Sequence, residues 1–288
     1  MSEIKEIRNK IYCIKNTQKI TRAMEMISIS KMKKSELKMN SGRPYLNVTQ
    51  AIVNNILSNN TKYKHVFFEK RERKRIGIII ISTDRGLCSC LNTTLFKKVK
   101  IFIETQNSKN ITCNLSILGL KGISFFQFLS KNIIYSETNL KKNYEFSNYL
   151  NFINIFIKYY NEKKIDNLFV AFNKFKNTFI QTPLIIQLLP LSKKIDIKKK
   201  NNYWDYIYES NSKRLLDKLF KNYIQSQIYQ AILENYACEQ VARMIAMKQA
   251  TDNSKKLIQD LQISYNKARQ DNITQELTEI VSGASAIS

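Results

Sequence analysis

The residues best placed to do chemistry follow an apolar run in the first third of the chain. The run IGIIIIST leads into Ser82-Thr83-Asp84-Arg85-Gly86, the place where a doubly wound α/β domain would hold a cofactor phosphate. A dinucleotide site requires several glycines there, and a P-loop requires a Lys-Ser or Lys-Thr pair after its glycine. Only Gly86 is present. The stretch therefore predicts a tight turn that caps the following helix, and no cofactor site.

Other catalytic and metal-binding patterns are equally weak. His65 is the only histidine, and the surrounding YKHVFFEKRERK contains no motif, so a surface role is favoured over a catalytic triad. Asp84 and Arg85 favour a local ion pair, without a second group for acid–base work. The five cysteines form no CxxC pair, which favours free thiols over a zinc site. The residues point to a scaffold or coupling protein with no catalytic, cofactor or metal site.

Composition permits a folded protein with a strongly basic surface. The chain has 288 residues, 43% of them hydrophobic, and a formal net charge of +24, which suits one domain with an extended part or two small domains. Its longest apolar runs, such as Ile76 to Ile81, fall far short of the ~20 residues that span a bilayer. The start MSEIKEIRNK is charged throughout, unlike a signal peptide. We expect a soluble or peripheral protein.

The first of two long helices is predicted at the N-terminus. The first 41 residues contain no glycine or proline, and Ile4, Ile7, Ile11 and Ile14 recur in steps of three and four, which places them on one helical stripe. Beyond Ile14 the apolar residues are Ile20, Met24 and Ile27, so the seam is expected to shift round the helix. Gly42, Arg43 and Pro44 predict a kink.

The second long helix is predicted at the C-terminus. Glycine and proline are absent from Leu191 through Ser282, and apolar residues recur at helical spacings: Leu216, Leu219, Tyr223, Leu257, Leu261, Ala268, Ile273, Leu277 and Ile280. Helices over 2–57 and 211–286 would be ~80 Å and more than ~110 Å long. Neither fits inside a compact domain. An antiparallel coiled coil, in which the longer helix overshoots its partner, is the economical arrangement.

The middle of the chain predicts an α/β domain. Strands are expected at IGIIIIST, ITCNLSILGL, DNLFVAFNKF and TFIQTPLIIQLLPL, and helices at about 91–104, 121–130 and 148–160. This alternation indicates a largely parallel, Rossmann-like sheet flanked by the two terminal helices. The expected division is a helix over 1–57, the α/β domain over 70–190, a linker over 191–210 and a helix over 211–288.

Three separated stretches of the sequence carry extended motifs. The first is Ile7 to Lys34, which contains NTQKITRAMEM, and the second is STDRGLCSCLN. The third carries Ile273, Thr274, Glu276, Glu279, Gly283, Ala284 and Ala286 in the spacing I-T-x-E-x-x-E-x-x-x-G-A-x-A. All three resemble one family, the gamma subunits of bacterial F-type ATP synthases, in which the second stretch reads STDRGLCGGLN. Ser89 and Cys90 stand where the family has two glycines, so the geometry of that turn is open.

The resemblance implies a non-catalytic rotor shaft. The two terminal helices would stand as a coiled coil in a ring of alpha and beta subunits, and the α/β domain would lie beside the epsilon subunit and the membrane c-ring. Proton flow would turn the shaft, which would couple ion transport to ATP synthesis in beta. The implied location is the cytoplasmic face of the bacterial inner membrane, with membrane contact only through the complex.

The resemblance also implies three groups of contact residues. Rotor coupling contacts would be Met24, Arg243, Gln270, Thr274 and Glu276. Arg8, Lys10 and Arg22 would meet acidic beta surfaces, because residues 1–41 carry ten Lys or Arg against four acids. Trp204, Tyr206 and Tyr208 would contact epsilon or the c-ring, with packing against the α/β domain as the alternative.

Two other functions are compatible with the residues alone. A basic coiled-coil adaptor that binds nucleic acid or an anionic membrane would retain DNA in moderate salt. A cofactor-free α/β enzyme with helical extensions would show turnover in isolation. The resemblance favours neither, and no nucleic acid partner is expected.

Overall fold

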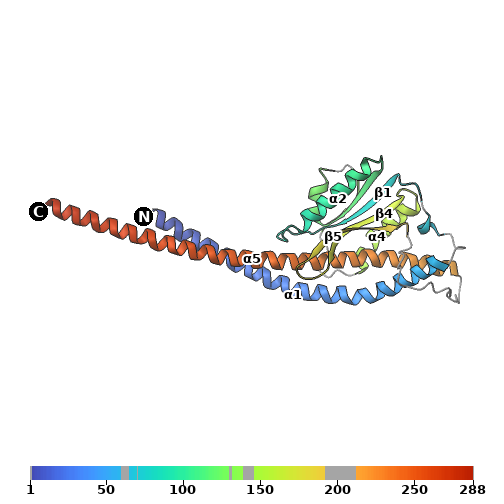
Figure 1. The fold of residues 1–288 in the computed structure, drawn as a ribbon, viewed down its shortest axis with the longest axis horizontal. Coiled ribbons are helices and arrows are strands. Elements are labelled where there is room, and N and C mark those ends of the chain that lie inside the picture. The colour runs from blue at the N-terminus through green and yellow to red at the C-terminus, as the bar shows by residue number, and fades with distance from the viewer. Residues whose placement is uncertain are drawn as a thin grey trace. The chain divides into compact units, whose positions relative to one another are not determined.

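The computed structural model describes residues 2–59, 65–69, 71–129, 132–138, 146–191 and 212–287. The elements follow in the order α1 (Ser2–Asn59), η1 (Val66–Phe68), β1 (Arg75–Ile81), α2 (Leu91–Asn107), β2 (Thr112–Leu118), α3 (Leu120–Phe126), β3 (Ile133–Glu137), α4 (Phe146–Asn161), β4 (Asn167–Phe175), β5 (Gln181–Leu189) and α5 (Ser212–Ile287) (Figure 1). Two terminal helices thus flank an α/β domain, which confirms the predicted fold class.

The chain forms two compact units. The first joins Met1–Ser30 to Arg243–Ser288, and the second comprises Lys31–Ala242. The first unit is a helical pair. The second contains the sheet with the rest of α1 and α5. The division predicted from sequence at 57, 70, 190 and 211 stays a prediction.

The sheet has five strands in the order β3-β2-β1-β4-β5. The first four are parallel, and β5 pairs with β4 antiparallel. Pro183 is tolerated because β5 is an edge strand, where a missing backbone donor does not break a central ladder. Strand β3 was not predicted. Its five residues lie on the opposite edge and are mostly half-buried, and its apolar run, Ile133 to Tyr135, is much shorter than that of β1.

Alternation along β1 builds a core on each face of the sheet. Ile76, Ile78 and Ile80 pack with α2 and α3, whereas Ile79 and Ile81 pack with α4 and with the α5 and α1 segments of this unit. Both faces are covered, which explains why β1 is a continuous apolar run and not an alternating one.

The terminal helices are each one element. Helix α1 contains Pro44 without interruption, and the kink predicted there stays a prediction. In this second unit α1 approaches α5 closely at Gly42, where an added Cβ would lie 2.9 Å from Gln230 Oε1. Buried Ser35, Met39 and Leu46 continue the same helix face.

Ser89 has a backbone conformation that suits the glycine of the family pattern. Its φ is 53°, whereas that of Cys90 is −87°. A non-glycine residue in the left-handed region costs about 1–2 kcal/mol, partly offset by the extra unfolded-state entropy of glycine, about 0.5–1 kcal/mol.

We therefore expect Ser89→Gly to raise the unfolding free energy by about 0.5–1 kcal/mol, measured by urea denaturation of the purified chain. Cys90→Gly is the matched control and should be destabilising, because Cys90 already has negative φ. A lower urea midpoint for Ser89→Gly than for the wild type would contradict the strain argument.

Candidate functional site: the helical pair, and the packing of the sheet in the second unit

The first unit is an antiparallel pair made by the start of α1 and the end of α5 (Figure 1). The Thr21 and Thr251 hydroxyl oxygens lie 2.8 Å apart across the pair. On α1 the stripe of Ile4, Ile7 and Ile11 is half-buried. On α5 the covered positions alternate in steps of four and three and are Met247, Thr251, Ser254, Ile258, Leu261, Tyr265, Ala268 and Asn272.

The predicted shift of the α1 seam is wrong. Ile20 and Ile27 are 60% and 55% exposed, whereas Thr21 and Ser28, on the original repeat, are 8% and 2% exposed. Hydroxyl residues can be buried here because they bond to their own helix: Thr21 donates to the Gln18 carbonyl at 3.0 Å and Ser28 to the Met24 carbonyl at 2.8 Å. Small side chains also let helices approach closely. The apolar residues are thereby left on the outer surface.

Helix α5 extends beyond the start of α1, as predicted. Its last partly covered residue is Asn272, and the described side chains from 273 to 285 are all exposed. Ile273, Leu277 and Ile280 are 48%, 57% and 67% exposed at helical spacing, so they form an apolar stripe on this end of α5.

Three of the predicted coupling residues lie on this end of α5. Gln270, Thr274 and Glu276 are exposed. The Thr274 hydroxyl donates to the Gln270 carbonyl at 3.0 Å, which agrees with their expected proximity one turn apart.

Met24 and Arg243 do not join those three. Met24 is half-buried and lies one turn from Thr21, so it is level with the Thr251 region of α5. Gln270 is nineteen residues beyond Thr251, or about 28 Å along the helix. Met24 and Gln270 therefore lie at different levels of the helical pair. Arg243 is 7% exposed and lies eight residues before Thr251 on α5.

The predicted basic contacts are all accessible. Arg8, Lys10 and Arg22 are exposed on α1. Lys10 Nζ lies 2.7 Å from Glu6 Oε1, and this hydrogen bond and charge lower the pKa of Glu6. Such an exposed pair leaves the lysine available to a partner. Trp204, Tyr206 and Tyr208 lie outside the described residues, and their contact role stays a prediction.

The turn after β1 is hydrogen-bonded to the junction between β2 and α3. Ser82 Oγ donates to the Leu118 carbonyl at 2.8 Å and accepts from the Gly122 N–H at 3.0 Å. Asp84 Oδ1 accepts from the Leu120 N–H at 3.0 Å. The turn therefore caps α3, which begins beside the end of β1 through the β1–β2 pairing. It also bonds to α2, the helix that follows it: the Leu91 N–H donates to the Cys88 carbonyl at 3.3 Å, and Asn92 Nδ2 donates to Thr83 Oγ1 at 2.7 Å.

Helix α5 occupies the crevice beside this turn. The connections from β1 and to β4 run to opposite sides of the sheet, so the gap between their carboxyl ends is the switch point where such sheets bind ligands. Here a packed cluster fills it: Cys88 and Leu91 from the β1 side, Cys238 and Ala242 from α5, with Phe175 of β4 against them. Burial raises the pKa of the Cys238 thiol well above its usual value.

His65 is half-buried and packed against neighbouring side chains, so it is not the free surface residue that its charged neighbours suggest. Its Nδ1 accepts from the Phe67 N–H at 3.1 Å, which caps η1, and its Nε2 lies 3.0 Å from Asp217 Oδ1 on α5. The ring packs against Phe67, Phe68 and Phe220. No spacing motif could have shown this, because Asp217 and Phe220 come from the other end of the chain.

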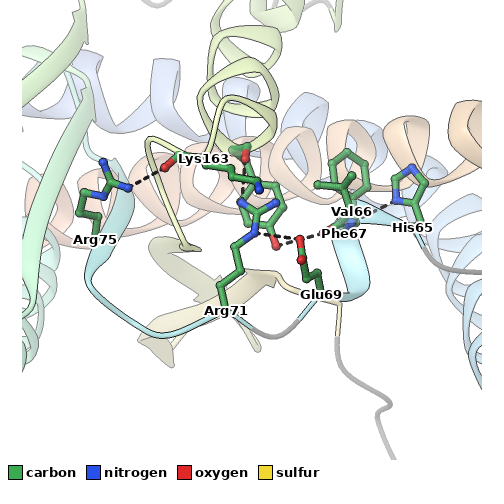
Figure 2. A network of polar contacts seen from close by, with 8 residues as sticks. His65, Val66, Phe67, Glu69, Arg71, Arg75 and Lys163 are labelled. Carbon is green, nitrogen blue, oxygen red and sulfur yellow. Dashed lines mark hydrogen bonds and ion pairs between the residues drawn. The ribbon is translucent and has the colours of Figure 1, made fainter.

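The segment between η1 and β1 is held at the C-terminal end of α4 (Figure 2). Arg71 donates to the Tyr160 carbonyl at 3.0 Å and pairs with Glu69 at 3.2 Å, and Arg75 donates to the Lys163 carbonyl at 2.8 Å. Guanidinium groups are favourable there because helix carbonyls concentrate negative potential at that end. This network fixes where β1 enters the sheet.

None of the helices in the described ranges is both long and apolar enough to cross a membrane. Within the same ranges no three His, Cys, Asp or Glu side chains gather where they could hold a metal ion.

Comparison with known proteins gives one consistent match. A family model described as ATP synthase matches residues 3–287. The chain is 69% identical to the ATP synthase gamma chain of Buchnera aphidicola subsp. Melaphis rhois and 60% identical to that of subsp. Schlechtendalia chinensis, in each case over 100% of this chain and 99% of the relative.

Solved structures share the fold. The rotor of the Euglena gracilis mitochondrial ATP synthase matches with a TM-score of 0.67 and 19% identity over 94% of this chain and 99% of that one. A chain of the Tetrahymena thermophila mitochondrial central stalk and c-ring matches with a TM-score of 0.63 and 24% identity, over 80% and 99%.

Proposed function

Because this chain belongs to the family of ATP synthase gamma chains, we propose that it is the non-catalytic central-stalk subunit of an F-type ATP synthase. It couples proton flow through the c-ring to ATP synthesis or hydrolysis in the ring of alpha and beta subunits. The observation that supports this best is the exposed apolar stripe Ile273, Leu277 and Ile280 on the overshooting end of α5. Apolar stripes of this kind mark surfaces that a partner covers.

The outer surface of α1 supports the same function. Ile20, Met26 and Ile27 are at least 55% exposed, and Arg22 lies exposed among them. The surface is apolar and basic on α1 but polar around Gln270 and Glu276. The chemistry of the shaft surface therefore differs from one side to another. Rotation of such a surface inside a ring presents a different contact to each beta subunit. Each beta conformation is then favoured in turn by the contact it makes.

The partners proposed are the alpha, beta and epsilon subunits and the c-ring. Arg8, Lys10 and Arg22 would meet acidic beta surfaces. We propose that Met24, Arg243, Gln270, Thr274 and Glu276 contribute to coupling as two separate levels of the shaft, since the structure places them apart. The complex would hold the chain peripherally at the cytoplasmic face of the bacterial inner membrane.

Co-purification tests the proposal. An affinity-tagged chain, expressed with the other subunits of its synthase and extracted from membranes in mild detergent, is expected to bring down larger subunits in fixed stoichiometry. ATP hydrolysis should accompany the complex and be absent from the chain alone. Recovery of the chain only as a free protein, or of DNA retained in moderate salt, would contradict the function.

The same experiment includes a variant with Arg8→Glu, Lys10→Glu and Arg22→Glu. If these residues meet acidic surfaces, the variant should assemble less and lose coupled synthesis, most clearly at low ionic strength. Unchanged assembly and synthesis would refute the electrostatic contact and leave the central-stalk function intact.

A further inference from the structure

Inside the second unit, the sheet is joined to α5 mostly through apolar contacts. Ile228, Ile232 and Leu233 of α5 pack in the core that α5 shares with the sheet. Apolar contacts are non-directional, so they oppose separation more strongly than sliding. A part that transmits rotation needs contacts that also fix position along and around the helix.

Strand β4 offers such contacts because it extends beyond the end of its pairing with β1. Its pairing with β1 ends at Ala171, whereas β4 itself continues to Phe175. Opposite Asn173 in β5 is Pro183, which has no N–H to donate. Neither neighbouring strand therefore supplies a donor for the Asn173 carbonyl, although Asn173 is fully buried.

Two side chains of α5 take the place of the missing strand. Asn235 Oδ1 accepts from the Asn173 backbone N–H at 3.3 Å and from its Nδ2 at 3.0 Å. Cys238 Sγ donates to the Asn173 carbonyl at 3.3 Å. Asn235 and Cys238 are three residues apart and so share a helix face. A shift of α5 by one turn would break all three bonds and leave buried polar groups without partners, which is costly.

Helix α1 is tied to the same part of α5. Gln230 Nε2 donates to the Met39 carbonyl at 3.3 Å, and Arg43 lies 3.8 Å from Glu234 Oε1. Burial raises the pKa of the Glu234 carboxyl, and the charge of Arg43 opposes that rise. One two-turn segment of α5 thus bonds to both the sheet and the other shaft helix.

We propose that Asn173, Asn235 and Cys238 are the positioning residues through which the α/β domain transmits torque to the shaft. The joint lies at the switch point where related sheets hold a ligand, and the chain's own helix fills that place. This inference rests on the central-stalk function proposed above. It adds the site at which force passes from the domain to α5.

The test uses the assembled synthase in inverted membrane vesicles and measures ATP-driven proton pumping per ATP hydrolysed. Asn235→Ala removes the acceptor of a buried N–H. The equilibrium between the bonded position of α5 on β4 and a displaced position should therefore shift by about tenfold towards the displaced position. We expect pumping per ATP to fall at least about twofold while hydrolysis persists. The matched control Ile232→Val weakens the neighbouring apolar contact, and its ratio should stay at the wild-type value.

A second pair of variants covers the case in which Asn235→Ala does not assemble. Cys238→Ser keeps a donor and should retain the wild-type ratio, whereas Cys238→Ala removes the donor and should lower it. Equal pumping per ATP in Cys238→Ala, Cys238→Ser and wild type would contradict the proposed role of these positioning residues. An equal fall in Ile232→Val and Asn235→Ala would contradict it as well. A wild-type complex that hydrolyses ATP without pumping would instead count against the central-stalk function.

Discussion

Replacing Gly119 by alanine is expected to lower the unfolding free energy of the chain by about 3–5 kcal/mol. Gly119 has φ of 99°, and an added Cβ would lie 2.6 Å from the Ser82 carbonyl oxygen and 2.7 Å from Ser82 Oγ. These atoms cannot move aside cheaply. The Ser82 N–H donates to the Leu118 carbonyl at 2.8 Å, and its hydroxyl holds Leu118 and Gly122.

The consequence should extend to assembly. Ser82 begins the turn that leads to Cys88 and Leu91, and these two residues pack against α5 at the proposed joint. A displaced turn would therefore loosen that contact. Urea denaturation measures the loss of stability, and recovery of complex from membranes measures the loss of assembly.

Gly86→Ala is the control in the same turn. Its added Cβ would meet only Lys121 Cε at 3.7 Å, an ordinary contact, so the change should stay within about 1 kcal/mol and be neutral or stabilising. If Gly119→Ala unfolds at the same urea concentration as Gly86→Ala, the close approach to Ser82 does not constrain the turn.

Local patterns were sufficient for most elements of the fold. Three such patterns were the apolar run at β1, the isoleucine stripe on α1 and the long stretches without glycine or proline. Each of them can be recognised from residues that are close together in the sequence. Strand β3 was missed because an edge strand needs few apolar residues. The antiparallel orientation of β5 was also not predicted, since a single strand pattern does not specify which neighbour it joins.

The contact surface was less predictable because it depends on pairs far apart in sequence. Thr21 and Ser28 are buried at the helix interface although their types suggest exposure, and Ile20 and Ile27 are exposed although their types suggest burial. Only the pairing of Thr21 with Thr251 settles which side of α1 faces inward. The bonds from Asn173 to Asn235 were missed for the same reason. They arise because β4 extends beyond its pairing with β1, and no sequence motif indicates this difference.

Met24→Lys is expected to reduce ATP-driven proton pumping at least about threefold while ATP hydrolysis is largely retained. Met24 lies beside the buried Thr21 pair and is half-buried, so a partner that passes this level of the shaft would meet a flexible, uncharged side chain. A lysine keeps a similar stem, which can extend its ammonium towards water. The fold should therefore tolerate the change, and the new charge would act mainly on the moving contact. Pumping and hydrolysis are measured on the same vesicles.

Thr274→Val provides the comparison at the other level of the shaft, about 35 Å beyond Thr251 along α5. It removes the exposed hydroxyl that donates to Gln270 and keeps the side-chain shape, so its effect on stability should be below about 0.5 kcal/mol. A fall in pumping per ATP in both variants, with normal assembly, would assign coupling roles to both levels, because the chemistry in beta would be intact and only transmission impaired. Loss of pumping and hydrolysis in parallel, with poor recovery of the complex, would show that Met24 serves only to hold the helical pair together and that Thr274 serves only assembly.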